Sequence, residues 1–130
     1  MKNLSERINV KDIASWFLIG LLTLIFAVAG SAKMAGVAQV TLPFERMGVP
    51  PMAYVVGLLE IAGAVGLLMS KIRFMAAFGL STIMVGAIGY HMILDPDKAV
   101  IPAIILFILT GFLAWRTEHR KEIYHENITY

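Results

Sequence analysis

Cysteine is absent from the 130 residues of this chain. Its absence excludes disulfide bonds, metal or iron–sulfur sites held by thiolates, and any thiol redox cycle within the chain. Charge is also scarce, because Asp, Glu, Lys and Arg make up 15% of the residues against 58% hydrophobic residues. A soluble core of this size needs a polar shell. With a mean hydropathy of +0.77, the composition favours a protein of the lipid bilayer.

Motifs that would mark an enzyme or a nucleic-acid-binding protein are also missing. The sequence has no glycine-rich phosphate loop, no GxSxG turn and no nucleophile beside a base. Its three histidines are too scattered for a metal or haem site, since only His91 lies within an apolar segment. The net charge of +2 comes from residues beside apolar segments rather than from one basic patch. We therefore expect no metal, no covalently bound cofactor and no nucleic-acid partner.

Long apolar segments dominate what is present. About 20 helical residues span a hydrocarbon core of about 30 Å, and the chain has four segments of roughly this length. Backbone polar groups in lipid must be paired within each segment, and the alternating short strands of a barrel are absent. The sequence predicts an all-α fold, a bundle of four transmembrane helices forming a single domain over residues 1–130. The predicted spans are residues 13–32, 52–70, 74–94 and 99–115.

The first span has an alternative interpretation as a cleaved signal peptide. Ala27-Val28-Ala29 resembles a small-residue cleavage site that follows a basic start. However, the apolar run is longer than the roughly 7–15 residues of a signal peptide. We therefore favour a first helix that is retained.

The distribution of Lys and Arg predicts the orientation of the spans. Cytoplasmic loops are enriched in positive charge, so both termini and the turn between the second and third spans are expected in the cytoplasm, with the bundle in a bacterial inner membrane. Trp16 and Trp115 then lie at the inner interface, and Tyr54 and Tyr90 at the outer one. The predicted cytoplasmic side holds Lys2, Arg7, Lys11, Lys71, Arg73, Arg116, Arg120 and Lys121, and the other side holds Lys33, Arg46 and Lys98.

The segment between the first two spans, residues 33–51, is too apolar for a plain solvated linker. Its apolar residues recur at steps of three and four, which predicts a short helix along the membrane surface. Pro43 interrupts or restarts this helix, and Gly48 is a natural helix stop. The C-terminal residues 116–130 are expected to extend the last helix as a charged cytoplasmic tail.

Glu60 is the most informative residue, because an unpaired carboxylate in the middle of a span costs several kcal/mol. On a helical wheel it shares a face with small residues, which allow another helix to approach closely and place the acid inside the bundle. We favour a carboxylate that binds a ligand or accepts a proton, and the alternative is an acid that only stabilises packing. The small residues expected at this contact are Gly57, Gly63 and Ala64.

Two further residues are candidates for the same site. Lys33 ends the first span, and its long side chain either reaches Glu60 or extends to the lipid head groups. His91 lies near the outer end of the third span. Its side chain is expected to point away from a small-residue stripe on that span. If this stripe packs against another helix, His91 faces away from Lys33 and Glu60. The glycines of the stripe are Gly79, Gly86 and Gly89.

Taken together, several of these stretches resemble the DoxX-like family of membrane proteins. The resemblance covers roughly residues 15–95, and the segment around Glu60 with the lysine that ends the first span is its most specific part. It implies a four-helix membrane bundle in which Lys33, Glu60, Arg73 and His91 are pattern positions. The matching stretches are Gly30-Ser31-Ala32-Lys33-Met34 with Gly36, Gly48-Val49-Pro50-Pro51, Gly57-Leu58-Leu59-Glu60-Ile61-Ala62-Gly63, Arg73 and Gly86-Ala87-Ile88-Gly89-Tyr90-His91.

The function that this resemblance implies is heterogeneous. The member that gives the family its name is a small subunit linked to thiosulfate:quinone oxidoreduction, others associate with redox or oxidative-stress complexes, and distant animal relatives help receptors to assemble. A shared fold does not determine an activity. Because this chain has no cysteine, a redox role would require a partner subunit or a bound quinone.

The leading hypothesis is therefore a membrane subunit or binding protein, not an enzyme on its own, in which Glu60, with Lys33 and His91, binds a quinone-like molecule or a lipid head group. A second hypothesis is a membrane enzyme in which Glu60 acts as general acid or base on a hydrophobic substrate or in quinone-linked redox. A third is a dimeric proton-coupled transporter, and a fourth is an assembly factor. The expected partners are membrane lipid and either further copies of the chain or a membrane or redox subunit.

Overall fold

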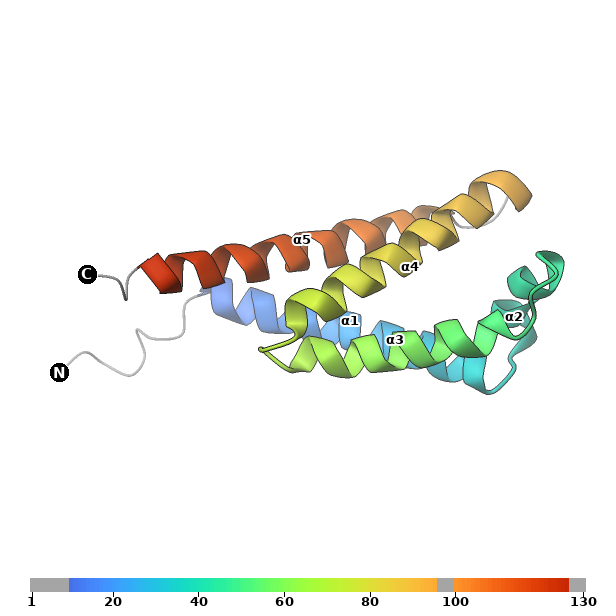
Figure 1. Ribbon diagram of the computed structural model, residues 1–130, viewed down its shortest axis with the longest axis horizontal. Helices are drawn as coiled ribbons and strands as arrows, with labels where there is room; N and C mark the ends of the chain where they lie inside the picture. The colour runs from blue at the N-terminus through green and yellow to red at the C-terminus, as the bar shows by residue number, and fades with distance from the viewer. Residues whose placement is uncertain (1–9, 96–99, 127–130) are drawn as a thin grey trace.

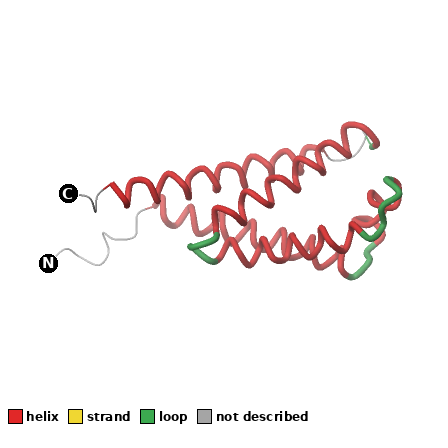
Figure 2. Tube along the Cα trace, viewed as in Figure 1, coloured by secondary structure: helices red, strands yellow, loops and turns green. Residues whose placement is uncertain are grey.

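The computed structural model describes residues 10–95 and 100–126 of the chain. This part is all-α, as predicted, and Figure 2 shows its helices joined by short loops. Three of the helices are long and apolar enough to cross a membrane: α1, α4 and α5. The third helix, α3, is apolar but shorter, with 17 residues. The helices are α1 (Val10–Met34), α2 (Ala38–Arg46), α3 (Met52–Leu68), α4 (Arg73–Leu94) and α5 (Val100–Glu126).

The helices α1, α3, α4 and α5 form two antiparallel pairs. The helix α1 packs along α3, α4 packs along α5, and α3 and α4 join the pairs. Figure 1 shows that the pairs lie close together near the turn between α3 and α4 and diverge toward the end that carries α2. Contacts between α1 and α5 are few, and they include hydrogen bonds from Arg116 and Arg120 of α5 to Lys11 and Asp12 of α1. The bundle is therefore closed at one end and open at the other.

Apolar side chains hold the closed part of the bundle together. The buried core takes residues from α1, α3, α4 and α5, and burial of apolar area is the main favourable term in such packing. Many large apolar side chains instead point outward, such as Phe17 and Met75, each 73% exposed. An outer surface of this kind suits contact with acyl chains. The core residues are Ile19, Leu22, Phe26, Ala64, Leu67, Ala77, Leu80, Met84, Leu113 and Ala114.

The short helix α2 lies between two glycines in the left-handed region. Gly36 has φ +71° and Gly48 has φ +75°, which side chains with a Cβ atom rarely adopt. Pro43 lies inside the helix without ending it. The chain thus turns sharply before and after α2, and Figure 1 shows α2 folded against the open end of the bundle.

Small residues of α3 lie at close helix contacts. A Cβ atom added to Gly57 would lie 2.9 Å from the carbonyl oxygen of Gly30, and one added to Gly63 would lie 2.7 Å from the side chain of Leu80. Ala64 is buried in the core. Gly57 and Gly63 therefore permit the approach of α1 and α4 on either side of α3.

The prediction that Gly79, Gly86 and Gly89 pack against another helix of the chain is wrong. A Cβ atom added to any of the three would meet no atom within 4 Å. The helix α4 packs instead through larger residues such as Ala77 and Leu80, because these bury more apolar area than a glycine face can. The predictions that concern Lys2, Arg7 and Lys98 fall outside the described residues.

Candidate functional site

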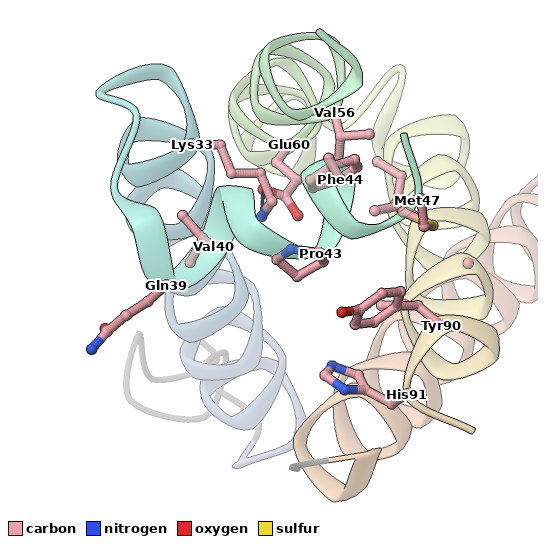
Figure 3. Close-up of a pocket in the computed structure, with 13 residues that line it drawn as sticks. Lys33, Gln39, Val40, Pro43, Phe44, Met47, Val56, Glu60, Tyr90 and His91 are labelled. Atoms are coloured by element: carbon pink, nitrogen blue, oxygen red, sulfur yellow. Dashed lines mark hydrogen bonds and ion pairs between the residues drawn. The ribbon is translucent and has the colours of Figure 1, made fainter. Parts of the chain in front are cut away.

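A pocket of about 460 Å³ lies at the open end of the bundle. It is bounded by the last turn of α1, by α2, and by α3 and α4, and most of its lining is apolar. Figure 3 shows α2 crossing in front of it, with Pro43 and Phe44 near the polar residues behind them. Its size falls within the usual range of small-molecule sites. The lining residues are Lys33, Gln39, Val40, Pro43, Phe44, Met47, Val56, Glu60, Ile83, Gly86, Ala87, Tyr90 and His91.

An ion pair between Lys33 and Glu60 forms one wall of the pocket. The Nζ of Lys33 donates a hydrogen bond to Oε2 of Glu60 at 2.7 Å. Glu60 is 2% exposed as a residue, and the Lys33 side chain is 12% exposed. The side chain of Lys33 therefore reaches inward to Glu60 and does not extend to the lipid head groups.

Close packing of α1 on α3 brings this pair together. Gly30 and Gly57 face each other, and a Cβ atom on Gly57 would also lie 2.9 Å from Cβ of Lys33. Lys33 therefore lies beside Gly57, and Glu60 follows Gly57 by one turn of α3, a distance that the long lysine side chain reaches across. A lysine in the last turn of α1 also lies at the negative end of the helix dipole, which favours its charge.

His91 forms another part of the pocket wall. Its ring packs edge-on against Tyr90 at 5.3 Å between centroids, and Figure 3 shows both side chains directed toward Pro43. The Nδ1 atom is buried and has no hydrogen-bond partner within residues 10–95 and 100–126. His91 and Gly86 of α4 both line the pocket, whereas Gly79 and Gly89 of the glycine stripe do not. The three candidate residues therefore line one cavity.

The arrangement provides hydrogen-bonding groups in an apolar cavity. Lys33 carries three N–H donors and uses one on Glu60. His91 adds a ring nitrogen that is free to accept or donate. The Lys33–Glu60 pair has no net charge, so the cavity offers polarity without a strong preference for an anion or a cation. Among the described residues, no group of three or more His, Asp or Glu could hold a metal ion.

Several features of the site were not found by sequence reasoning. The close contact at Gly30 is one of them, although a glycine in a small-residue run one turn before Lys33 is a sequence signal for close helix packing. The contributions of Pro43 and Phe44 could not be inferred, because the path of α2 depends on the turns at Gly36 and Gly48.

A second ion pair ties α2 to the end of α4. Arg46 lies 3.5 Å from Asp95, and the two side chains are 46% and 21% exposed. The loop and α2 have few other contacts with the helices beneath them. This ion pair therefore joins α2, which lies in front of the pocket, to the helix pair of α4 and α5.

Arg46→Gln is expected to loosen α2 without unfolding the bundle. An exposed ion pair contributes about 0.2–1 kcal/mol, so amide hydrogens of residues 38–47 should exchange up to about fivefold faster. Hydrogen exchange with mass spectrometry measures this. Glu45→Gln, which removes a charge from the neighbouring exposed residue, is the control, and equal rates in the two variants would refute a role for the pair.

Most of the chain, including the helices that line the pocket, matches the model of a known family. The model of the DoxX-like family matches residues 17–113, well over half of the sequence, from within α1 to within α5. The chain belongs to the DoxX-like family. All three pocket residues discussed above fall inside the match. No curated protein and no solved structure matches this DoxX-like chain. Family membership and the three candidate spans together make it a multi-pass membrane protein.

Proposed function

We propose that this DoxX-like protein binds a small uncharged lipophile, such as a quinone-like molecule or the polar end of a lipid, in the pocket at the open end of its bundle. The supporting observation is the buried Lys33–Glu60 pair in the wall of an otherwise apolar cavity. An oxygen atom of the ligand would accept a hydrogen bond from Lys33, and a second polar group would meet His91. The protein acts as a binding subunit, either with a partner membrane protein or with further copies of itself.

The proposal places four helices across the bacterial inner membrane. At 1.5 Å per residue, α3 is about 26 Å long, slightly less than the hydrocarbon core, and a small mismatch is accommodated by local thinning of the bilayer. Connectivity supports a crossing by α3. Figure 1 shows α1 leading to α2 at one end and α4 starting at the other, so the chain returns through α3.

Charge supports an orientation with both termini in the cytoplasm. The closed end carries Lys11, Lys71, Arg73, Arg116 and Arg120 among the described residues. The open end carries Lys33 and Arg46, and both are paired with carboxylates. The positive-inside rule favours the closed end as the cytoplasmic one, which puts the pocket in the outer half of the membrane.

Electrostatics favour an uncharged ligand head over a charged one. An anionic head would be attracted by Lys33 but repelled by Glu60, which lies 2.7 Å away, and a cationic head would meet the opposite problem. Either charge would also lose its hydration on entry to an apolar cavity. A neutral carbonyl or hydroxyl group instead gains hydrogen bonds without this cost.

Filling the pocket tests the proposal. Gly86 lines the cavity, and a Cβ atom there meets nothing within 4 Å. Gly86→Leu should therefore insert a side chain into the cavity, leave the fold intact, and reduce the retained lipophile at least tenfold. The measurement is native mass spectrometry of protein extracted into nanodiscs from the membrane, with identification of the small molecules and polypeptides that remain bound.

Gly79→Leu is the matched control for this experiment. Gly79 lies on the same helix and also has open space around it, but it does not line the pocket. Its variant should retain the lipophile at the wild-type level. Equal loss in the two variants, or wild-type protein that retains a polypeptide partner and no lipophile, would contradict the proposed binding function.

A further inference from the structure

Three arginines gather at the closed end of the bundle, remote from the pocket. Arg73 begins α4, and Arg116 and Arg120 lie on the last turns of α5. Figure 1 shows the start of α4 and this part of α5 near the start of α1. The position corresponds to the cytoplasmic membrane surface in the proposed orientation, and a site there depends on that orientation but not on the ligand of the pocket.

Arg73 is held in place without a carboxylate. Its Nε donates to the carbonyl oxygen of Leu67 at 2.6 Å, and Nη2 donates to that of Leu68 at 3.4 Å. The guanidinium lies over the ring of Trp16, 5.2 Å from its centroid, in a cation–π contact. No Asp or Glu of the described chain lies within ion-pair distance of it. Arg73 therefore has a fixed position and an uncompensated charge.

The neighbouring guanidiniums add further positive charge. Arg116 donates to the carbonyl oxygen of Lys11 at 3.0 Å, and Arg120 contacts Asp12 at 2.6 Å. Arg120 is also close enough to Arg73 for the two positive charges to repel each other. Of these three guanidiniums in the described chain, only that of Arg120 has a carboxylate within ion-pair distance, and an anion bound between Arg73 and Arg120 would relieve their repulsion.

The surroundings of Arg73 fit a lipid better than a soluble anion. Apolar side chains flank it along α1 and the turn between α3 and α4, and the Trp16 ring beside it is 59% exposed. Acyl chains would lie against this wall while a phosphate met the guanidiniums, as basic sites at the cytoplasmic ends of membrane helices do. The exposed apolar residues are Ile13, Phe17, Leu68, Met69 and Ile72.

We propose that the closed end binds the phosphate of one anionic phospholipid of the inner leaflet, with Arg73 as the principal contact and Arg120 as the second. The bidentate geometry of arginine suits a phosphate. A zwitterionic lipid would gain less, because its own ammonium group opposes the same charges.

The test compares lipids retained by the full chain in nanodiscs that contain equal amounts of phosphatidylglycerol and phosphatidylcholine. Native mass spectrometry should show wild-type protein carrying phosphatidylglycerol in preference to phosphatidylcholine. Arg73→Gln should reduce the retained phosphatidylglycerol at least about fivefold, the factor for one charge near an anionic membrane surface. Lys71→Gln removes one charge from an exposed position two residues away and should change retention less than twofold.

Two further variants keep the test decisive if Arg73→Gln folds poorly. Arg120→Gln leaves the contacts of Arg73 with α3 intact and should still lower the retention of phosphatidylglycerol two- to fivefold. Arg73→Lys keeps the charge but loses the planar fork, so retention should fall between wild type and Arg73→Gln. Equal retention of the two lipids by wild-type protein, or equal losses in Lys71→Gln and Arg73→Gln, would overturn the proposed site. Neither outcome bears on the pocket, whose ligand is measured separately.

Discussion

Glutamine in place of Glu60 is expected to lower the free energy of unfolding by about 3 kcal/mol. The carboxylate is buried and accepts a hydrogen bond from Lys33. Glutamine keeps the shape and an acceptor oxygen, but it leaves the Lys33 ammonium in an apolar environment without a compensating charge. Unfolding by sodium dodecyl sulfate in mixed micelles measures the change, and a loss below about 1 kcal/mol would show that the pair is not desolvated as the structure has it.

A double variant separates the structural role of this pair from its role in binding. Replacing both partners of a buried ion pair with apolar residues of similar volume is often neutral or stabilising. Lys33→Met combined with Glu60→Leu should therefore return the free energy of unfolding to within about 1 kcal/mol of wild type. The double variant should nevertheless lose the lipophile, because the cavity no longer offers a polar contact at that wall.

The outcome of the double variant decides between the two roles that the sequence left open for Glu60. A stable double variant that still carries the lipophile would make the pair a packing element only. A stable double variant without the lipophile would assign the pair to binding, since loss of fold would no longer explain the loss of ligand.

The sequence could indicate the Lys33–Glu60 contact because an unpaired charge inside a membrane costs free energy. Few partners for Glu60 exist in the apolar segments, and a lysine at the end of the first span has a side chain long enough to reach inward. Gly57 indicated the face of α3 on which another helix could approach. The same reasoning produced the all-α fold, since long apolar segments leave few alternatives in lipid.

The face of α4 that packs against the other helices was not predictable from the sequence in the same way. In water, the apolar stripe of a helix identifies its packed face, but α4 is apolar on nearly every side because lipid replaces solvent around it. The glycine stripe was therefore a reasonable guess for the packed face, and packing of Leu80 and Met84 into the core decided otherwise. That packing brought His91 to the pocket.

Gly30→Ala is expected to disrupt the bundle by adding a single methyl group. Its Cβ atom would lie 2.5 Å from the carbonyl oxygen of Gly57 and 2.8 Å from Cγ1 of Ile61. Backbone atoms cannot rotate away as side chains can, so α1 must separate from α3. Overpacking of this kind costs about 3 kcal/mol, measured as the free energy of unfolding in mixed micelles.

Gly20→Ala provides the matched control on the same helix. Gly20 is exposed and has no atom within 4 Å of an added Cβ, so its variant should remain within about 0.5 kcal/mol of wild type. Because Lys33 follows Gly30 by one turn, separation of α1 from α3 should also draw Nζ away from Glu60 and reduce the retained lipophile. Equal stability of the two alanine variants would mean that α1 and α3 are not in backbone contact, and the geometric basis for the buried ion pair would then be lost.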